Sequence, residues 1–164
     1  MKQSVFFVFI ALLFWGTTYV QAQSAPAAGR DSSEIVRLSW KASKDGDIKT
    51  VSALADEMLK AYGDKAKSLA SQLSSFPTHD KIDDYKIMSD VATCLFIKAE
   101  ALMHQGKNDQ AIAEFKNVIA QYPWSQSFDP SRGSYWSIAE KSQSSINVME
   151  GKEPQTAAPV KNPP

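Results

Sequence analysis

The segment from Ala92 to Pro123, ATCLFIKAEALMHQGKNDQAIAEFKNVIAQYP, constrains the fold of this chain more than any other stretch. Its apolar and small residues recur every three or four positions, which is the period of an amphipathic helix and not the alternation of a strand. These residues are Ala92, Leu95, Ala99 and Leu102 in the first half and Ala111, Ile112, Phe115, Val118, Ile119 and Tyr122 in the second. Residues 106–108 have the composition of a tight turn, and Asn108 is a good cap for a following helix that Pro123 would end. The segment therefore predicts two helices joined by a turn.

With this spacing, the segment resembles a tetratricopeptide repeat (TPR), a motif of about 34 residues that forms a pair of helices. The positions that match the motif are Leu95, Ala99, Leu102, Gly106, Ala111, Phe115, Val118 and Pro123. Two residues depart from it, because Lys98 stands in place of a leucine and Val118 in place of an alanine. A weaker copy covers Ser32 to Met58, although the two copies are separated by more than one repeat length. The resemblance implies an all-α fold of antiparallel helix pairs.

The same period predicts helices along the rest of the chain. One begins after the cap Asp31, and a second runs from Asp47 to about Leu73, where an unbroken apolar stripe favours passage through Gly63 over a break. The first helix of the central repeat extends back to about Asp80. After a loop over residues 123–133, a last helix over residues 134–150 would close the stack, because an uncovered end repeat exposes its apolar face. The fold is therefore expected to contain about five helices in antiparallel pairs, including a closing C-terminal helix.

The two ends of the chain differ in composition from the helical TPR-like domain expected over residues 31–150. Residues 1–22 combine Lys2, the apolar run VFFVFIALLFW and a small final residue, which is typical of a secretory signal peptide. The run is shorter than the ~20 residues of a membrane-spanning helix, so cleavage after Ala22, or alternatively after Ser24, is favoured over an uncleaved anchor, and no membrane span would remain. Residues 23–30 are predicted to be a flexible leader and the proline-rich residues 151–164 a disordered tail. The protein is therefore predicted to be exported, either to the periplasm or as a secreted protein.

No group of residues predicts catalysis, a metal site or a cofactor site. The 18 basic and 18 acidic residues balance and the basic residues do not cluster, so nothing indicates nucleic-acid binding. The acidic neighbours of His79 are better explained by the charge preference of a helix start, and His104 with Glu100 by an exposed helical pair. The single cysteine, Cys94, excludes an internal disulfide and fits a small packing residue, with a reactive thiol or an intermolecular disulfide as alternatives. We therefore expect a non-enzymatic protein without cofactors.

The resemblance supplies the one candidate binding site. In TPR proteins the first helix of each pair lines a concave groove, which by register would contain Phe96, Glu100 and Met103, with Val36 and Trp40 from the first pair. The lysine and asparagine with which several family members hold a peptide carboxylate are absent, because Phe96 and Glu100 take their places. An aromatic surface with a methionine suits an apolar or amphipathic segment of a protein partner. The alternative is that Trp40 and Phe96 lie in the core.

The predicted function is that of an exported interaction module, a scaffold or adaptor that binds a segment of a protein or peptide partner in a helical groove. The alternative comes from a different class of protein, a carrier for a small ligand or hydrophobic cargo. Its ligand would lie between the long helices, beside Trp40, Tyr62 and Met88.

Overall fold

The structure, a computed structural model, describes residues 29–153 and 159–161. Within these ranges, five α-helices account for most of the chain, accompanied by one 3-10 helix and a two-stranded sheet. In chain order the elements are α1 (Ser32–Lys44), α2 (Ile48–Ala70), η1 (His79–Tyr85), α3 (Lys86–His104), α4 (Asn108–Gln121), β1 (Gln126–Asp129), β2 (Ser134–Ser137) and α5 (Ile138–Met149). The expected all-α fold with a C-terminal closing helix is confirmed. The predicted signal peptide and most of the predicted leader lie outside the described residues.

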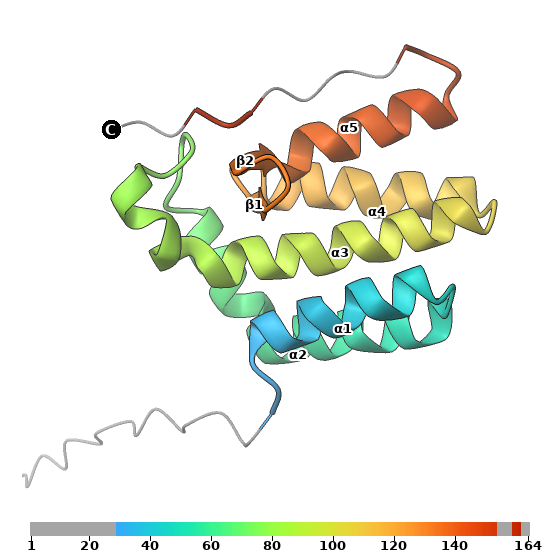
Figure 1. The fold of residues 1–164 in the computed structure, drawn as a ribbon, viewed down its shortest axis with the longest axis horizontal. Coiled ribbons are helices and arrows are strands. Elements are labelled where there is room, and N and C mark those ends of the chain that lie inside the picture. The colour runs from blue at the N-terminus through green and yellow to red at the C-terminus, as the bar shows by residue number, and fades with distance from the viewer. Residues whose placement is uncertain (1–28, 154–158, 162–164) are drawn as a thin grey trace, which may run out of the picture.

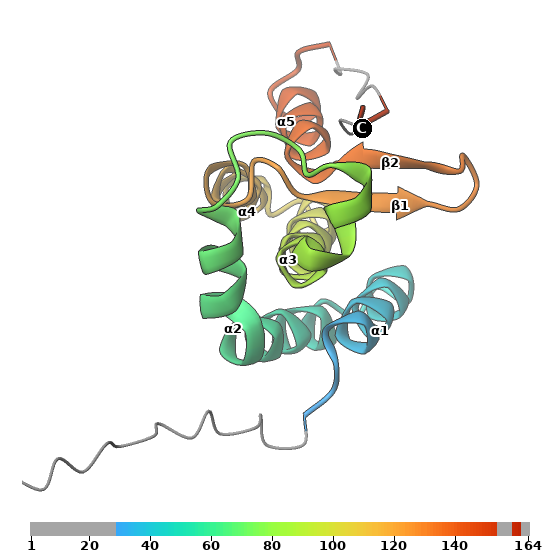
Figure 2. The ribbon, with the colours of Figure 1, turned by 90° about the vertical axis from the view of Figure 1, so that its left-hand side faces the viewer.

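The helix α3 is at the centre of the domain. In Figure 1, α1, α3 and α5 run side by side in one direction, while α2 and α4 run in the opposite direction. Viewed along the helices in Figure 2, α1 and α2 lie on one side of α3, and α4 and α5 lie on the other. As a result, α3 packs against all the other α-helices. The antiparallel pairs α1–α2 and α3–α4 thus stack on each other, and α5 covers the second pair.

The three parallel helices repeat one packing pattern. In each helix, a large apolar residue that is at most 1 % exposed is followed four positions later by a small residue with no exposed surface. The pairs are Ile35 and Ser39, Leu95 and Ala99, and Ile138 and Ser142. The hydroxyls of Ser39 and Ser142 each donate a hydrogen bond of 2.8 Å to the carbonyl four residues earlier, so neither buried hydroxyl is unsatisfied. The small residues allow neighbouring helices to approach closely.

The same turn ends all three of these helices. Gly46, Gly106 and Gly151 have φ angles of 72°, 71° and 70°, a left-handed conformation that side chains with a Cβ atom disfavour. At each turn the residue after the glycine donates its amide to the carbonyl five positions earlier. These bonds join Asp47 to Ala42 (2.9 Å), Lys107 to Leu102 (3.0 Å) and Lys152 to Asn147 (2.8 Å). The pattern is a Schellman motif, and it confirms the turn predicted at Gly106. The predicted cap is wrong by one residue, because Lys107 is the N-cap of α4 and Asn108 is its first helical residue.

Two long helices differ in detail from the sequence prediction. The helix α2 passes through Gly63 without interruption, as its apolar stripe indicates, but ends at Ala70 instead of near Leu73. The central helix was expected to begin near Asp80. Instead, residues 79–85 form the 3-10 helix η1, and the α-helix begins at Lys86.

A β-hairpin occupies the segment where the sequence predicted a loop and the first turn of the last helix. The strands pair antiparallel through Gln126 and Ser137, Ser127 and Trp136, Phe128 and Tyr135, and Asp129 and Ser134. The helix α5 begins only after Ser137, whose hydroxyl accepts a hydrogen bond of 3.1 Å from the amide of Glu140. The prediction of a helix starting at Ser134 is therefore wrong by one turn.

The described end of the chain returns to this hairpin. Pro159 pairs antiparallel with Trp136, and the amide of Val160 donates a hydrogen bond of 3.0 Å to the carbonyl of Tyr135. The predicted disordered tail over residues 151–164 is therefore wrong for residues 159–161. Residues 154–158 and 162–164 lie outside the described part of the chain.

Candidate binding surface

The predicted groove residues of α1 and α3 have different environments. Trp40 of α1 is 40 % exposed, so the alternative that it lies in the core is wrong. Val36, one turn earlier on the same helix, is half-buried and packs against the core. On α3, Glu100 and Met103 are also half-buried, and Met103 contacts the core.

Phe96 is a core residue and not a groove residue. Its side chain is 1 % exposed, with its ring centroid 5.6 Å from that of Phe115 on α4 and 5.5 Å from that of Trp136 on β2. These distances are typical of packed aromatic pairs. The placement of Phe96 in a binding groove is therefore corrected, because Trp136 of the hairpin covers it. The surface left for a partner is formed by Trp40, Glu100 and Met103, which we call the α1–α3 surface.

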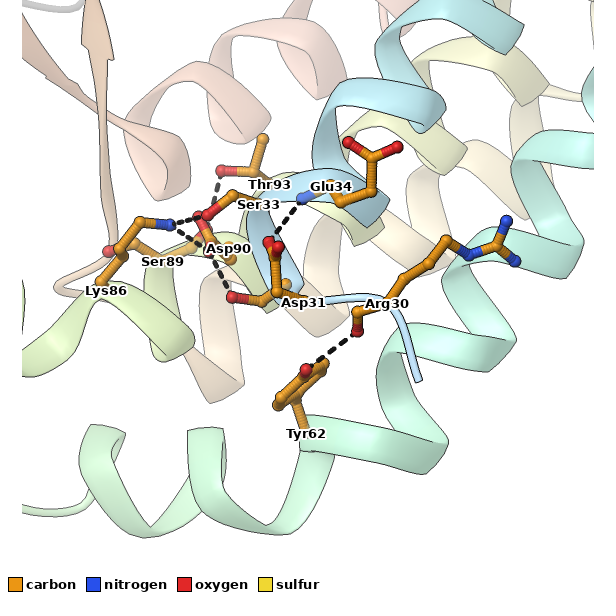
Figure 3. Close-up of polar contacts among 10 residues, drawn as sticks. Arg30, Asp31, Ser33, Glu34, Tyr62, Lys86, Ser89, Asp90 and Thr93 are labelled. Carbon is orange, nitrogen blue, oxygen red and sulfur yellow. Dashed lines mark hydrogen bonds and ion pairs between the residues drawn. The ribbon is translucent and has the colours of Figure 1, made fainter. Parts of the chain in front are cut away.

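Polar contacts fix how α1 lies along α3. The hydroxyl of Ser32 donates to a carboxylate oxygen of Asp90 at 2.6 Å, and that carboxylate also pairs with Lys86. Lys86 in turn donates to the hydroxyl of Ser33 at 2.6 Å, as Figure 3 shows. The charges on this short network are compensated, and the network joins the beginnings of the two helices. Sequence reasoning missed it, although the four-residue spacing of Lys86 and Asp90 is that of a helical ion pair.

A second contact fixes the position of α1 along α3 near Trp40. The oxygen of the Ser39 hydroxyl lies 3.1 Å from the sulfur of Cys94, in the buried seam between the helices. Trp40 follows Ser39 directly, so its backbone lies at about the level of the turn of α3 that contains Cys94 and Phe96. Because one helical turn is about 3.6 residues, Glu100 lies one turn further along α3. The α1–α3 surface thus includes an aromatic ring on α1 and a carboxylate on α3.

Burial raises the pKa of the Glu100 carboxyl, while the charges of Lys141 and His104 oppose this shift. Among the described residues, Glu100 takes part in none of the salt bridges within 4.0 Å. A half-buried carboxylate without a close cation is incompletely compensated. It is therefore suited to a basic group from outside the domain.

The opposite face, formed by α2 and α4, contains a groove of about 570 Å³ over α3. Its lining includes Ile48, Leu102, Lys98 and Glu114, and the last two form an ion pair of 2.7 Å. Lys98 is the residue that replaces the leucine of the TPR motif. The ion pair explains how a lysine is accommodated there, because the carboxylate of Glu114 compensates its charge.

The candidate metal ligands and the single cysteine, Cys94, form no reactive cluster in the described part of the chain. No group of three or more histidine, cysteine and acidic residues in the described ranges could hold a metal ion. Burial raises the pKa of the Cys94 thiol to about 11, so the thiol stays protonated at neutral pH. None of the described helices is both long enough and apolar enough to cross a membrane.

The residues suggested for a carrier lie in different surroundings. Met88 is 1 % exposed within the core, whereas Trp40 is at the surface. The Tyr62 hydroxyl donates a hydrogen bond of 3.0 Å to the carbonyl of Arg30, at the exposed end of the leader (Figure 3). Tyr62 itself is half-buried and packs against the core, so the three residues differ in environment and do not favour a shared ligand chamber.

No family model, curated protein or solved structure matches the chain in the comparisons with known proteins. The residues and the geometry of the α1–α3 surface are therefore the basis for inferring a function.

Proposed function

We propose that the chain is a TPR-like interaction module that binds an extended or helical segment of a protein partner on the α1–α3 surface. The observation that carries the proposal is the exposed Trp40 on α1 together with the half-buried carboxylate of Glu100 on the parallel helix α3, which takes part in none of the salt bridges among the described residues. Exposed tryptophans are enriched at binding hot spots, where a ring that becomes buried contributes much of the affinity.

The repeated geometry supports the TPR-like part of the proposal. The buried pair of a large and a small residue occurs in α1, α3 and α5, and the same glycine turn follows each of them. The helix α5 is therefore equivalent to a third first helix, which the sequence resemblance did not include. In a repeat stack, such first helices stand side by side and create a continuous surface.

The surface favours an amphipathic partner segment. An apolar side chain would cover Trp40, and a lysine or arginine one turn further along would pair with Glu100. Met103 is a flexible apolar side chain that adapts to the shape of its partner. Binding of this kind breaks no covalent bond, so we propose a non-enzymatic protein.

Export is part of the proposal and is supported by the composition of residues 1–22. Mass spectrometry of the protein recovered outside the cytoplasm should find Gln23 at the N-terminus, or Ala25 if cleavage follows Ser24. A chain that retains Met1 would contradict cleavage and favour an anchored protein.

Site-specific photo-crosslinking tests the binding surface. A photo-reactive phenylalanine analogue replaces Trp40 in one variant and Leu59 in the control, because Leu59 is 36 % exposed on α2 at the other face. We expect discrete adducts with a partner from position 40 and none from position 59. Glu100→Gln should reduce the yield at position 40, since it removes the charge that attracts the basic group. Equal adducts from both positions, or a yield unchanged by Glu100→Gln, would contradict the proposal.

A further inference from the structure

The two edges of the hairpin have different neighbours. At the edge of β1, the amide of Gln126 lies 3.4 Å from the hydroxyl of Ser89 on α3, so this strand lies against a helix. The edge of β2 faces away from β1 and receives residues 159–161 of the same chain. Figure 2 shows the hairpin projecting from the helices, with the red segment of residues 159–161 near β2. The outer edge of β2 thus offers backbone groups for a further strand.

The contact has the geometry of strand addition. The carbonyl of Tyr135 points away from β1 and accepts the amide of Val160 at 3.0 Å. Pro159 lies opposite Trp136, where an antiparallel strand directs its own backbone nitrogen away from β2. A proline at this position removes no hydrogen bond from the pairing with β2. Because its nitrogen carries no hydrogen, it also prevents another strand from pairing on the outer side of this segment.

Side chains on the two faces of the hairpin favour particular residue types in a segment that pairs with this edge. Residues that face each other across two strands share one side of the sheet, so Pro159 lies on the side of Trp136. Val160 then lies on the side of Tyr135, whose ring is 5.2 Å from that of Phe128. Val160 is half-buried, whereas Phe128 remains 50 % exposed. A proline followed by a β-branched apolar residue fits this arrangement.

We propose that the outer edge of β2 is a docking site for an extended segment of a partner protein that contains a proline followed by an apolar residue. The chain's own residues 159–161 occupy this site in cis and compete with the partner. The described contact consists of one residue pair and one hydrogen bond, so its occupancy depends on the covalent connection to α5, which raises the effective concentration of the segment. A partner that pairs over more residues of the edge would displace it. This site does not depend on the α1–α3 surface, since it uses the backbone of β2.

The first test is amide hydrogen exchange on the full exported chain. The Val160 amide should exchange more slowly than the amide of Lys161, because it donates to Tyr135. Val160→Pro removes this donor, whereas Val160→Thr keeps both the donor and the branched shape. An unprotected Val160 amide in the wild-type protein would overturn the proposal.

The second test adds the segment in trans. A fluorescent peptide with the sequence of residues 154–164, PQTAAPVKNPP, is titrated into the wild-type, Val160→Pro and Val160→Thr proteins, and its anisotropy is followed. We expect the Val160→Pro protein to bind the peptide at least about tenfold more tightly than the other two, because its edge is freed from the tethered competitor. Circular dichroism should show that all three proteins retain the same helix content.

The controls separate backbone docking from other modes of binding. A peptide whose valine nitrogen is methylated cannot donate to Tyr135 and should bind the Val160→Pro protein at least about tenfold more weakly. Equal binding of the unmodified peptide to all three proteins, undiminished binding of the methylated peptide, or no binding to Val160→Pro would each overturn the proposal. A wild-type dimer that Val160→Pro dissociates, seen by analytical ultracentrifugation, would also overturn it, because the segment would then occupy a second copy.

Discussion

At the scale of single residues, Phe115 is among the largest fully buried side chains of the core. Its side chain has no exposed surface and packs against Phe96. Phe115→Ala should lower the free energy of unfolding by about 3–5 kcal/mol, because the lost ring leaves a cavity between α3 and α4. Urea unfolding followed by circular dichroism measures this loss.

Phe128→Ala is the matched control for that variant, since Phe128 is a phenylalanine that is 50 % exposed on the hairpin. Its loss should cost less than about 1 kcal/mol. A Phe115→Ala protein as stable as the Phe128→Ala protein would show that Phe115 is not packed as described.

Glu100 should make stability depend on pH. Burial raises its pKa in the folded state above the ordinary 4.5, so the folded protein holds this proton more tightly than the unfolded chain. The resulting stability is present below the ordinary pKa and is lost as pH rises through the raised value. Glu100→Gln cannot ionise, so its stability relative to wild type should be higher at pH 7 than at pH 4. Urea unfolding at both pH values measures this difference.

Glu34 provides a control of opposite sign. A side-chain hydrogen bond from Arg37 lowers the pKa of this exposed carboxyl, so its contribution is present at neutral pH and is lost as pH falls. Glu34→Gln should therefore be less stable relative to wild type at pH 7 than at pH 4. Two variants with the same sign of pH dependence would contradict the assigned environments.

At the scale of the elements, two glycines should respond in opposite ways to substitution. Gly106 ends α3 with a φ of 71°, so Gly106→Ala should destabilise the protein by about 1–2 kcal/mol. Gly63 lies inside α2, where an added Cβ would meet the Leu59 side chain at an ordinary 3.7 Å. Gly63→Ala should therefore stabilise the protein by about 0.5–1 kcal/mol. Thermal melts of the two variants test this opposition, and a shift in the same direction would contradict the described backbone.

The helices of this fold could be predicted because their packing is periodic within each segment. The stripe through Gly63 and the turn at Gly106 are local patterns, and both are confirmed. The hairpin could not be found in this way, because its strands are only four residues long. In addition, Tyr135 stands three positions before Ile138, a spacing that also fits a helix.

The candidate site was harder to predict because its composition depends on contacts between distant segments. The register correctly placed Trp40 at the surface of α1. It also placed Phe96 in the groove, because nothing in α3 shows that Trp136, from a later segment, covers that ring. Docking of residues 159–161 on β2 was missed for the same reason, since a proline-rich composition alone is typical of a disordered segment.

At the scale of the whole molecule, the central position of α3 should organise the stability of the domain. Seven consecutive residues of this helix, from Val91 to Ile97, are buried. Their amides should exchange only through global unfolding, whereas the exposed stretch of α2 from Leu59 to Ala61 should also exchange through local opening. Native-state hydrogen exchange followed by mass spectrometry or NMR distinguishes the two helices. Equal protection of both stretches would argue against a central role for α3.

The tip of the hairpin has a practical consequence for work on this protein in cells. Residues 130–133 are exposed, and they follow a strand end at which the carboxylate of Asp129 accepts the amide of Ser131 at 2.9 Å. Figure 2 shows this tip at a distance from the helices. Exposed loop tips tolerate inserted sequence well. An epitope tag grafted after Arg132 should therefore report where the protein is found while the α1–α3 surface stays untouched.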